Sequence, residues 1–119
     1  MTRCPICQNA LYPRRLECGS CGTVLEGEFF LPRLARLDKE GQRLAEALIL
    51  HGGNLKEMSE DLGISYPTLK KRLTELSTAL RTLQKEDETR IEEILRAVES
   101  GSLKAEEGIR QIREINHEL

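Results

Sequence analysis

Four cysteines near the start of the chain stand in two pairs, with the spacing C-x2-C-x10-C-x2-C. Each pair can form a tight turn that points two thiolates at one ion, and the ten-residue spacer is long enough for a hairpin that brings the two turns together. Four thiolates in a tetrahedron suit Zn²⁺. The pattern therefore predicts one zinc ion bound by Cys4, Cys7, Cys18 and Cys21.

The predicted ion has a structural role. Four protein ligands leave no open position for water or substrate, whereas catalytic zinc sites have three protein ligands. Binding of the ion would fold a segment that is too small to fold alone. Two alternatives stay open: iron in a rubredoxin-like tetrahedron, since four sulfurs accept both metals, and free or redox-active cysteines.

The composition predicts small helical units beside this metal module. Of the 119 residues, 32% are charged and 3% are aromatic, with no Trp, so the cores must be built from Leu and Ile. No apolar run is long enough for a membrane-spanning helix, and no apolar segment follows Met1 as it does in a signal peptide. We therefore expect a cytoplasmic protein, where clustered cysteines favour metal over disulfides.

The first part of the chain, residues 1–28, holds all four cysteines and two short apolar pieces. These pieces, at residues 10–12 and 23–25, are predicted to form brief strands. The segment is therefore expected to be a zinc ribbon. Residues 29–37 form a linker that contains Phe29 and Phe30.

A helical period begins after the linker and predicts three helices over residues 38–84. Glycines at Gly52-Gly53 and at Gly63 are expected to end the first two helices. The predicted N-caps are Asp38, Asn54 and Ser65. The positions expected to face the core are Leu44, Leu48, Ile49, Leu55, Met58, Leu62, Ile64, Leu69, Leu73 and Leu76.

Residues 53–73 carry the pattern of a helix-turn-helix, two short amphipathic helices joined by a sharp glycine turn. The segment resembles the Fis-type helix-turn-helix of bacterial transcription factors. The residues that carry the resemblance are Gly53-Asn54, Gly63-Ile64-Ser65, Thr68-Leu69 and Lys70-Lys71-Arg72. The resemblance implies that the helix from Ser65 is a recognition helix and that double-stranded DNA is the partner.

Helical geometry agrees with this interpretation. If Leu69 and Leu73 are buried, Thr68 and Lys71 lie on the outer face, where they would meet the major groove. Lys70 and Arg72 flank this face and would meet phosphates. The candidate DNA-binding residues are Asn54, Lys56, Ser65, Tyr66, Thr68, Lys70, Lys71 and Arg72.

One position departs from the Fis-type pattern. Fis-type recognition helices often carry Arg directly after the turn residue, and this chain has Tyr66 there, followed by Pro67. The remaining positive charge is modest, and each phosphate contact adds affinity through counterion release. Weak or non-specific DNA binding therefore fits the sequence as well as tight operator binding.

Leu80 and Leu83 extend the stripe of the third helix with the 4-3 spacing of a heptad seam. They are expected to project beyond a compact three-helix unit and to need cover. The cover would come from the C-terminal hairpin or from a second subunit. A homo-oligomer, in particular a dimer, is favoured, because helix-turn-helix proteins commonly bind DNA as two-fold dimers.

The tail, residues 85–119, is predicted to be a separate helical hairpin. The charged segment 85–88 is expected to interrupt the stripe, and Gly101 and Ser102 are expected to close one helix and cap the next. The tail resembles a SHOCT-like helical hairpin, which implies an oligomerisation or protein-binding module. Residues 82–119 hold six basic and ten acidic residues, a balance that does not favour phosphate.

The sequence thus predicts a mainly α protein with a small β metal-binding module. Its parts are a zinc ribbon (1–28), a linker (29–37), a three-helix helix-turn-helix domain (38–84) and a C-terminal helical hairpin (85–119). This order is similar to an uncharacterised bacterial family that joins an N-terminal zinc ribbon to a Fis-like helix-turn-helix. The likeness covers roughly residues 4–80.

Catalysis is not expected, because no acid, base or nucleophile stands in a recognisable constellation and no Gly-rich phosphate loop is present in the sequence. Two functions remain. The favoured one is a DNA-binding transcriptional regulator. The alternative is a non-enzymatic adaptor that binds protein partners through the zinc ribbon and the helical hairpin.

Overall fold

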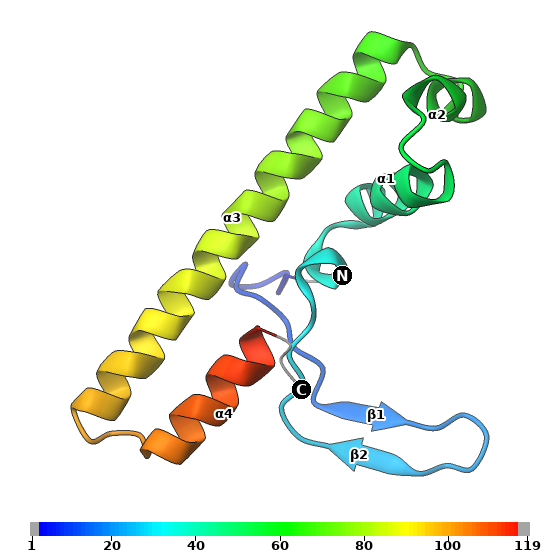
Figure 1. The fold of residues 1–119 in the computed structure, drawn as a ribbon. Coiled ribbons are helices and arrows are strands. Elements are labelled where there is room, and N and C mark those ends of the chain that lie inside the picture. The colour runs from blue at the N-terminus through cyan, green and yellow to red at the C-terminus, as the bar shows by residue number, and fades with distance from the viewer. Residues whose placement is uncertain (1–2, 117–119) are drawn as a thin grey trace. The chain divides into compact units, whose positions relative to one another are not determined.

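The computed structural model describes residues 3–116, which form two compact units. The central unit consists of Arg33–Glu88, and the terminal unit joins residues 3–32 to residues 89–116. Figure 1 shows the order of the helices and strands along the chain. One long helix, α3, contributes residues to both units.

The central unit is built from short helices and the first part of α3. Its elements are a 3-10 helix, η1 (Arg33–Arg36), and the helices α1 (Lys39–Leu50), α2 (Leu55–Leu62) and α3 (Tyr66–Glu99). The three predicted N-caps are confirmed, because each side-chain oxygen accepts a hydrogen bond from the N–H three residues on. The caps and their distances are Asp38 (2.7 Å), Asn54 (3.2 Å) and Ser65 (3.3 Å).

Glycine turns join these helices at the predicted positions. Gly52 and Gly53 follow α1 with φ angles of 58° and 79°. Gly63 is the C-cap of α2, with a φ of 67°. Residues with a Cβ rarely adopt a positive φ, so these positions favour glycine. The turns allow α1, α2 and the start of α3 to share one core.

That core is a single cluster of apolar side chains. Met58 and Leu69 are fully buried at its centre. The remaining buried members are Leu37, Leu44, Leu76 and Leu83, and the side chains packed against them include Leu48, Leu55, Ile64, Leu73 and Leu80. Most of the predicted core positions are therefore confirmed.

Two predicted core positions are wrong. Ile49 is 71% exposed and Leu62 is 46% exposed. Successive residues are turned by about 100° around a helix, so Ile49 cannot face the same side as Leu48. Leu62 is the last residue of the eight-residue helix α2.

The charged segment 85–88 does not interrupt α3, so the prediction of a helix break is wrong. The partly or fully buried stripe continues with heptad spacing from Leu83 through Asp87 and Arg90 to Ile94. The stripe therefore changes from apolar to charged residues and back while the helix remains regular.

Asp87 can lie in this buried stripe because it has charged partners inside the central unit. Its carboxylate, in a residue that is 4% exposed, accepts hydrogen bonds from Arg33 Nε at 2.9 Å and from Arg36 Nη2 at 2.6 Å. A buried charge without a partner costs several kcal/mol, and paired hydrogen bonds to two guanidinium groups offset that cost. The pairing fixes η1 on α3.

The leucines of the predicted seam are covered within the chain itself. Leu83 is buried and Leu80 is partly buried, and both pack with the cluster that contains Leu37. The need for cover, which favoured a second subunit, is therefore met inside the central unit. The homo-oligomer stays a prediction.

The terminal unit contains a small antiparallel hairpin of β1 (Arg15–Glu17) and β2 (Val24–Glu26), in which Leu16 lies opposite Leu25. The second predicted strand overlaps β2. The first predicted strand, at residues 10–12, is wrong, since Ala10 pairs only in an isolated bridge with Arg3. Pro13 follows it directly and has no N–H to donate to a ladder.

At the C-terminal end of the chain, α4 (Ala105–Ile115) packs on the end of α3, so a helical hairpin is present without a separate fourth helix. Gly101 makes the turn with a φ of 80°. A Cβ on Gly108 would lie 2.6 Å from Val98 Cγ2, so the two helices approach too closely for a side chain there. Ser102 is not the predicted cap, because α4 begins after Lys104 and the Ser102 hydroxyl is hydrogen bonded to Ser100 instead.

Among the described helices, none is both long enough and apolar enough to cross a membrane.

The buried charge cluster yields a stability prediction. Replacing Asp87 with Ala leaves Arg33 and Arg36 without their shared acceptor, and the free energy of unfolding is expected to fall by about 3 kcal/mol. The matched control is Glu88→Ala at the exposed next position, which is expected to change it by under about 0.5 kcal/mol. Urea unfolding measures both variants. Equal effects would contradict the pairing.

Candidate metal module and nucleic-acid interface

The first cysteine pair lies in a tight turn. The Cys4 N–H donates to Asn9 O at 2.8 Å, and the Gln8 N–H donates to Cys4 O at 2.9 Å. Gln8 has a φ of 63°, which is unusual for a residue with a Cβ. The isolated bridge between Arg3 and Ala10 closes the turn.

The second cysteine pair repeats this geometry. The Cys18 N–H donates to Thr23 O at 2.8 Å, and the Gly22 N–H donates to Cys18 O at 2.9 Å. Gly22 has a φ of 76°, and the pairing of Glu17 with Val24 closes the turn. Hydrogen bonds, positive φ and bridge occur at matching positions, so the two pairs form equivalent knuckles.

Local hydrogen bonds favour the thiolate form of one cysteine in each knuckle. Backbone N–H groups of Cys7 and Ile6 lower the pKa of Cys4, and the Ile6 nitrogen lies 3.4 Å from Cys4 Sγ. The hydroxyl of Thr23, 3.0 Å from Cys21 Sγ, is the main cause that lowers the pKa of Cys21 to about 7. The thiolate is the form that binds metal.

The structure forms each knuckle but does not bring the four sulfurs to one point. Within residues 3–116, no three Cys, His, Asp or Glu side chains gather closely enough to hold one ion. The donor set nevertheless fits zinc, because it offers two pairs of thiols on rigid turns. Binding of one ion by all four cysteines stays a prediction.

The second candidate site is the start of α3, whose outer face is open. All eight candidate DNA-binding residues are exposed. The first turn of α3 contains no acidic residue, and the N–H groups and dipole at a helix N-terminus attract anions. Lys70, Lys71 and Arg72 follow within the next turn. The structure thus concentrates positive charge at this helix end.

Several of these residues have partners inside the chain. Ser65 donates to the Thr68 hydroxyl at 2.8 Å, and Lys70 Nζ lies 5.7 Å from the Tyr66 ring centroid. Asn54 and Ser65 also serve as N-caps. These contacts orient the exposed groups without burying them.

Two of the basic side chains differ in their surroundings. Arg72 Nη1 lies 3.8 Å from Glu40 Oε1, an exposed pair that contributes little. Lys71 has no ion pair with any residue in the described range 3–116. Of Lys70, Lys71 and Arg72, Lys71 is therefore the side chain most available to a phosphate or a base.

The preceding helix, α2, is acidic and limits the extent of this surface. It holds three acidic residues and Lys56. His51 Nε2 lies 3.1 Å from Asp61 Oδ2 and its Nδ1 lies 3.7 Å from Glu57 Oε2, so part of this charge faces the end of α1. The central unit has ten basic and ten acidic residues, so any attraction for phosphate is local.

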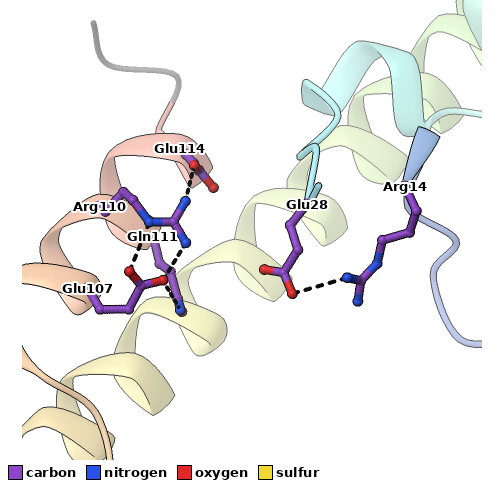
Figure 2. A network of polar contacts seen from close by, with 6 residues as sticks. All are labelled: Arg14, Glu28, Glu107, Arg110, Gln111 and Glu114. Atoms are coloured by element: carbon purple, nitrogen blue, oxygen red, sulfur yellow. Dashed lines mark hydrogen bonds and ion pairs between the residues drawn. The ribbon is translucent and has the colours of Figure 1, made fainter. Parts of the chain in front are cut away.

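The C-terminal hairpin uses its charges on itself (Figure 2). Arg110 pairs with Glu107 and Glu114, and Gln111 also donates to Glu107. Hydrogen bonds from Arg110, and then from Gln111, lower the pKa of Glu107 to about 2. Arg110 therefore has both of its ion-pair partners on its own helix.

Sequence reasoning missed the roles of Asp87 and Arg90. Asp87 was interpreted as part of the charged break at 85–88 and Arg90 was given no role, although both lie at the stripe positions that follow Leu83. Continuing the 4-3 spacing through the charged segment would have predicted that both face inward. Their partners, Arg33 with Arg36 and Tyr12 with Phe30, are not evident from spacing.

The two sites define a class of protein that joins paired-cysteine knuckles to a helix-turn-helix. Residues 4–35 match the family model described as DUF2089 zinc ribbon, and residues 37–83 match the model described as Domain of unknown function (DUF2089)-HTH. Two successive segments of the chain are therefore similar to the two domains of the DUF2089 family. No match was found among the curated proteins or the solved structures.

These matches confirm the predicted combination of a zinc ribbon with a helix-turn-helix domain. They also support zinc as the metal of the cysteine pairs. The finer resemblances, to Fis-type helix-turn-helix segments and to SHOCT-like hairpins, stay predictions.

The knuckle geometry yields a prediction about zinc affinity. Replacing Gly22 with Ala is expected to weaken binding about fivefold, because a Cβ at positive φ costs about 1 kcal/mol. Gly19→Ala is the matched control, since Gly19 lies in the same turn without a positive φ and a Cβ has open space at both positions. Competition with a chromophoric chelator measures both affinities. Identical values would contradict the proposed knuckle.

Proposed function

We propose that this chain is a non-enzymatic, DNA-binding transcriptional regulator whose cysteine knuckles bind a structural zinc ion. The observation that carries the proposal is the exposed start of α3, where an acid-free first turn is followed directly by Lys70, Lys71 and Arg72. The helix-turn-helix family match supports DNA as the partner. The buried face of the same helix is fixed by Leu69, which is 0% exposed.

The contacts favour different roles in DNA binding for the exposed residues of α3. Lys71 and Thr68 lie on the outer face and would reach base edges, while Lys70 and Arg72 lie beside them for phosphates. Tyr66 occupies the place where Fis-type helices often carry Arg, and Lys70 Nζ lies over its ring. We therefore propose binding that depends mainly on phosphates, with modest sequence preference.

Neutral overall charge sets the expected strength of binding. The central unit gains no long-range attraction to DNA from its net charge, so affinity must come from a few local contacts. Three to four phosphate contacts would give a salt dependence with a slope of about −3. This slope is smaller than that of large operator-binding proteins.

The seam leucines are already covered within the chain. The remaining support for the predicted homo-oligomer is that helix-turn-helix proteins commonly bind DNA as two-fold dimers. We propose that a second copy joins on DNA, with two half-sites one helical turn apart.

The alternative function is an adaptor that binds proteins through the zinc ribbon and the hairpin. Exposed apolar side chains on the ribbon, Ile6 and Leu25, favour that alternative.

Replacing Lys71 with Ala is expected to weaken binding to a short duplex by about 1.5 kcal/mol and to reduce the salt slope by about one. The matched control is Lys85→Ala, at an exposed lysine further along α3. Its affinity and slope should stay close to the wild type. Fluorescence anisotropy across a range of salt concentrations measures both.

A clear result separates the two functions. An unaltered affinity and slope for the Lys71 variant would contradict the regulator proposal. If neither variant nor the zinc-loaded wild-type protein binds DNA, the result would favour the adaptor.

A further inference from the structure

The guanidinium group of Arg90 lies against two aromatic rings of the terminal unit. Its Cζ is 4.6 Å from the centroid of Phe30 and 5.5 Å from the centroid of Tyr12. The rings contact each other edge to face, with centroids 5.7 Å apart at an interplanar angle of 67°. Arg90 Nη1 also donates to the Tyr12 hydroxyl at 3.4 Å. These three residues are called the Arg90 clamp.

The clamp contains half of the aromatic residues of the chain. The chain contains two Tyr, two Phe and no Trp, and two of these four aromatic residues contact one arginine. All three clamp residues are partly buried. Partial burial removes competing water and strengthens the attraction between a cation and an aromatic ring.

The two rings come from opposite ends of the β-hairpin. Tyr12 lies between the first knuckle and β1, and Phe30 follows β2. The hairpin brings them together through the hydrogen bond from Gly27 N–H to Arg14 O at 3.0 Å and the ion pair between Arg14 and Glu28 at 3.5 Å (Figure 2). The rings can meet on Arg90 only when this hairpin is closed.

The hairpin is too small to stay closed by itself. Each strand has three residues and all six are exposed. Isolated two-stranded hairpins are marginally stable in water. A zinc ion bound by both knuckles closes the segment from Cys7 to Cys18, which contains Tyr12, into a loop and so restricts the ring.

The other side of the clamp belongs to the C-terminal hairpin. Arg90 lies one helical turn before Ile94, which is buried, and Ile94 lies beside the close approach of α3 to Gly108. A residue that fixes the path of α3 at position 90 therefore affects how α4 packs on it.

We propose that Arg90 is a positioning residue that couples zinc binding at the cysteine knuckles to the order of the hairpin formed by residues 91–99 and α4. Zinc binding restrains the loop that carries Tyr12, the restrained loop holds the Tyr12 ring beside Phe30, and the two rings hold Arg90. Coupling between two events is reciprocal, so loss of the clamp also weakens zinc binding. The proposal does not depend on DNA binding.

The test compares Arg90→Gln with the wild type, using Zn²⁺ alone as the probe and the full chain. Arg96→Gln is the matched control, because Arg96 is an exposed arginine on the same helix. Zinc is expected to slow amide hydrogen exchange in α4 of the wild type and of the control. In Arg90→Gln, zinc should bind about tenfold more weakly and no longer slow exchange in α4.

A second variant protects the test against simple misfolding. Phe30→Leu keeps an apolar side chain but removes the ring face, and it should reduce the zinc-linked protection of α4 as well. Combining Phe30→Leu with Arg90→Gln should add little to either single change, because both remove one contact. Full zinc-linked protection of α4 in Arg90→Gln, or strictly additive effects in the double variant, would overturn the coupling.

Discussion

The structure depends on one inward-facing stripe of residues along α3. The middle positions of this stripe are occupied by charged residues. Leucines form the stripe as far as Leu83, Asp87 and Arg90 follow, and Ile94 returns it to apolar residues. A charge on a buried face is tolerated only when partners stand opposite it. Arg33 and Arg36 provide them for Asp87, and two aromatic rings provide them for Arg90. Within the central unit, the residues before α1 pair with Asp87. Within the terminal unit, the rings beside the cysteine hairpin contact Arg90.

This constraint also explains how a small chain presents a functional surface. Fixing the inner face of α3 by Leu69 leaves its first turns open, with caps and stacking contacts that orient the exposed groups. No acidic residue occupies the first turn, so the positive end of the helix and three basic residues act together. The unit as a whole is neutral, so the DNA binding that we propose would depend on this helix end rather than on the fold.

Much of this arrangement could be predicted from the sequence, because local signals control it. The cysteine spacing, the three N-caps and the glycine turns each act over a few residues, and all of the caps and turns named for α1 to α3 occur as expected. The continuation of α3 through residues 85–88 was missed, because it depends on partners more than fifty residues away. Propensity and periodicity carry no information about such partners. The same limit applies to Tyr12, which was predicted to lie in a strand. It contacts Arg90 instead, and that contact is not evident from the local sequence.

The central claim, that the outer face at the start of α3 binds duplex DNA, is tested most directly by an NMR titration. Amide resonances of the zinc-loaded, isotope-labelled chain would be followed while a short duplex is added. We expect the largest shifts at residues 65–72 and at the start of α2, with little change in α4. Shifts confined to the cysteine hairpin or to α4, or no shift at a saturating duplex concentration, would contradict the account.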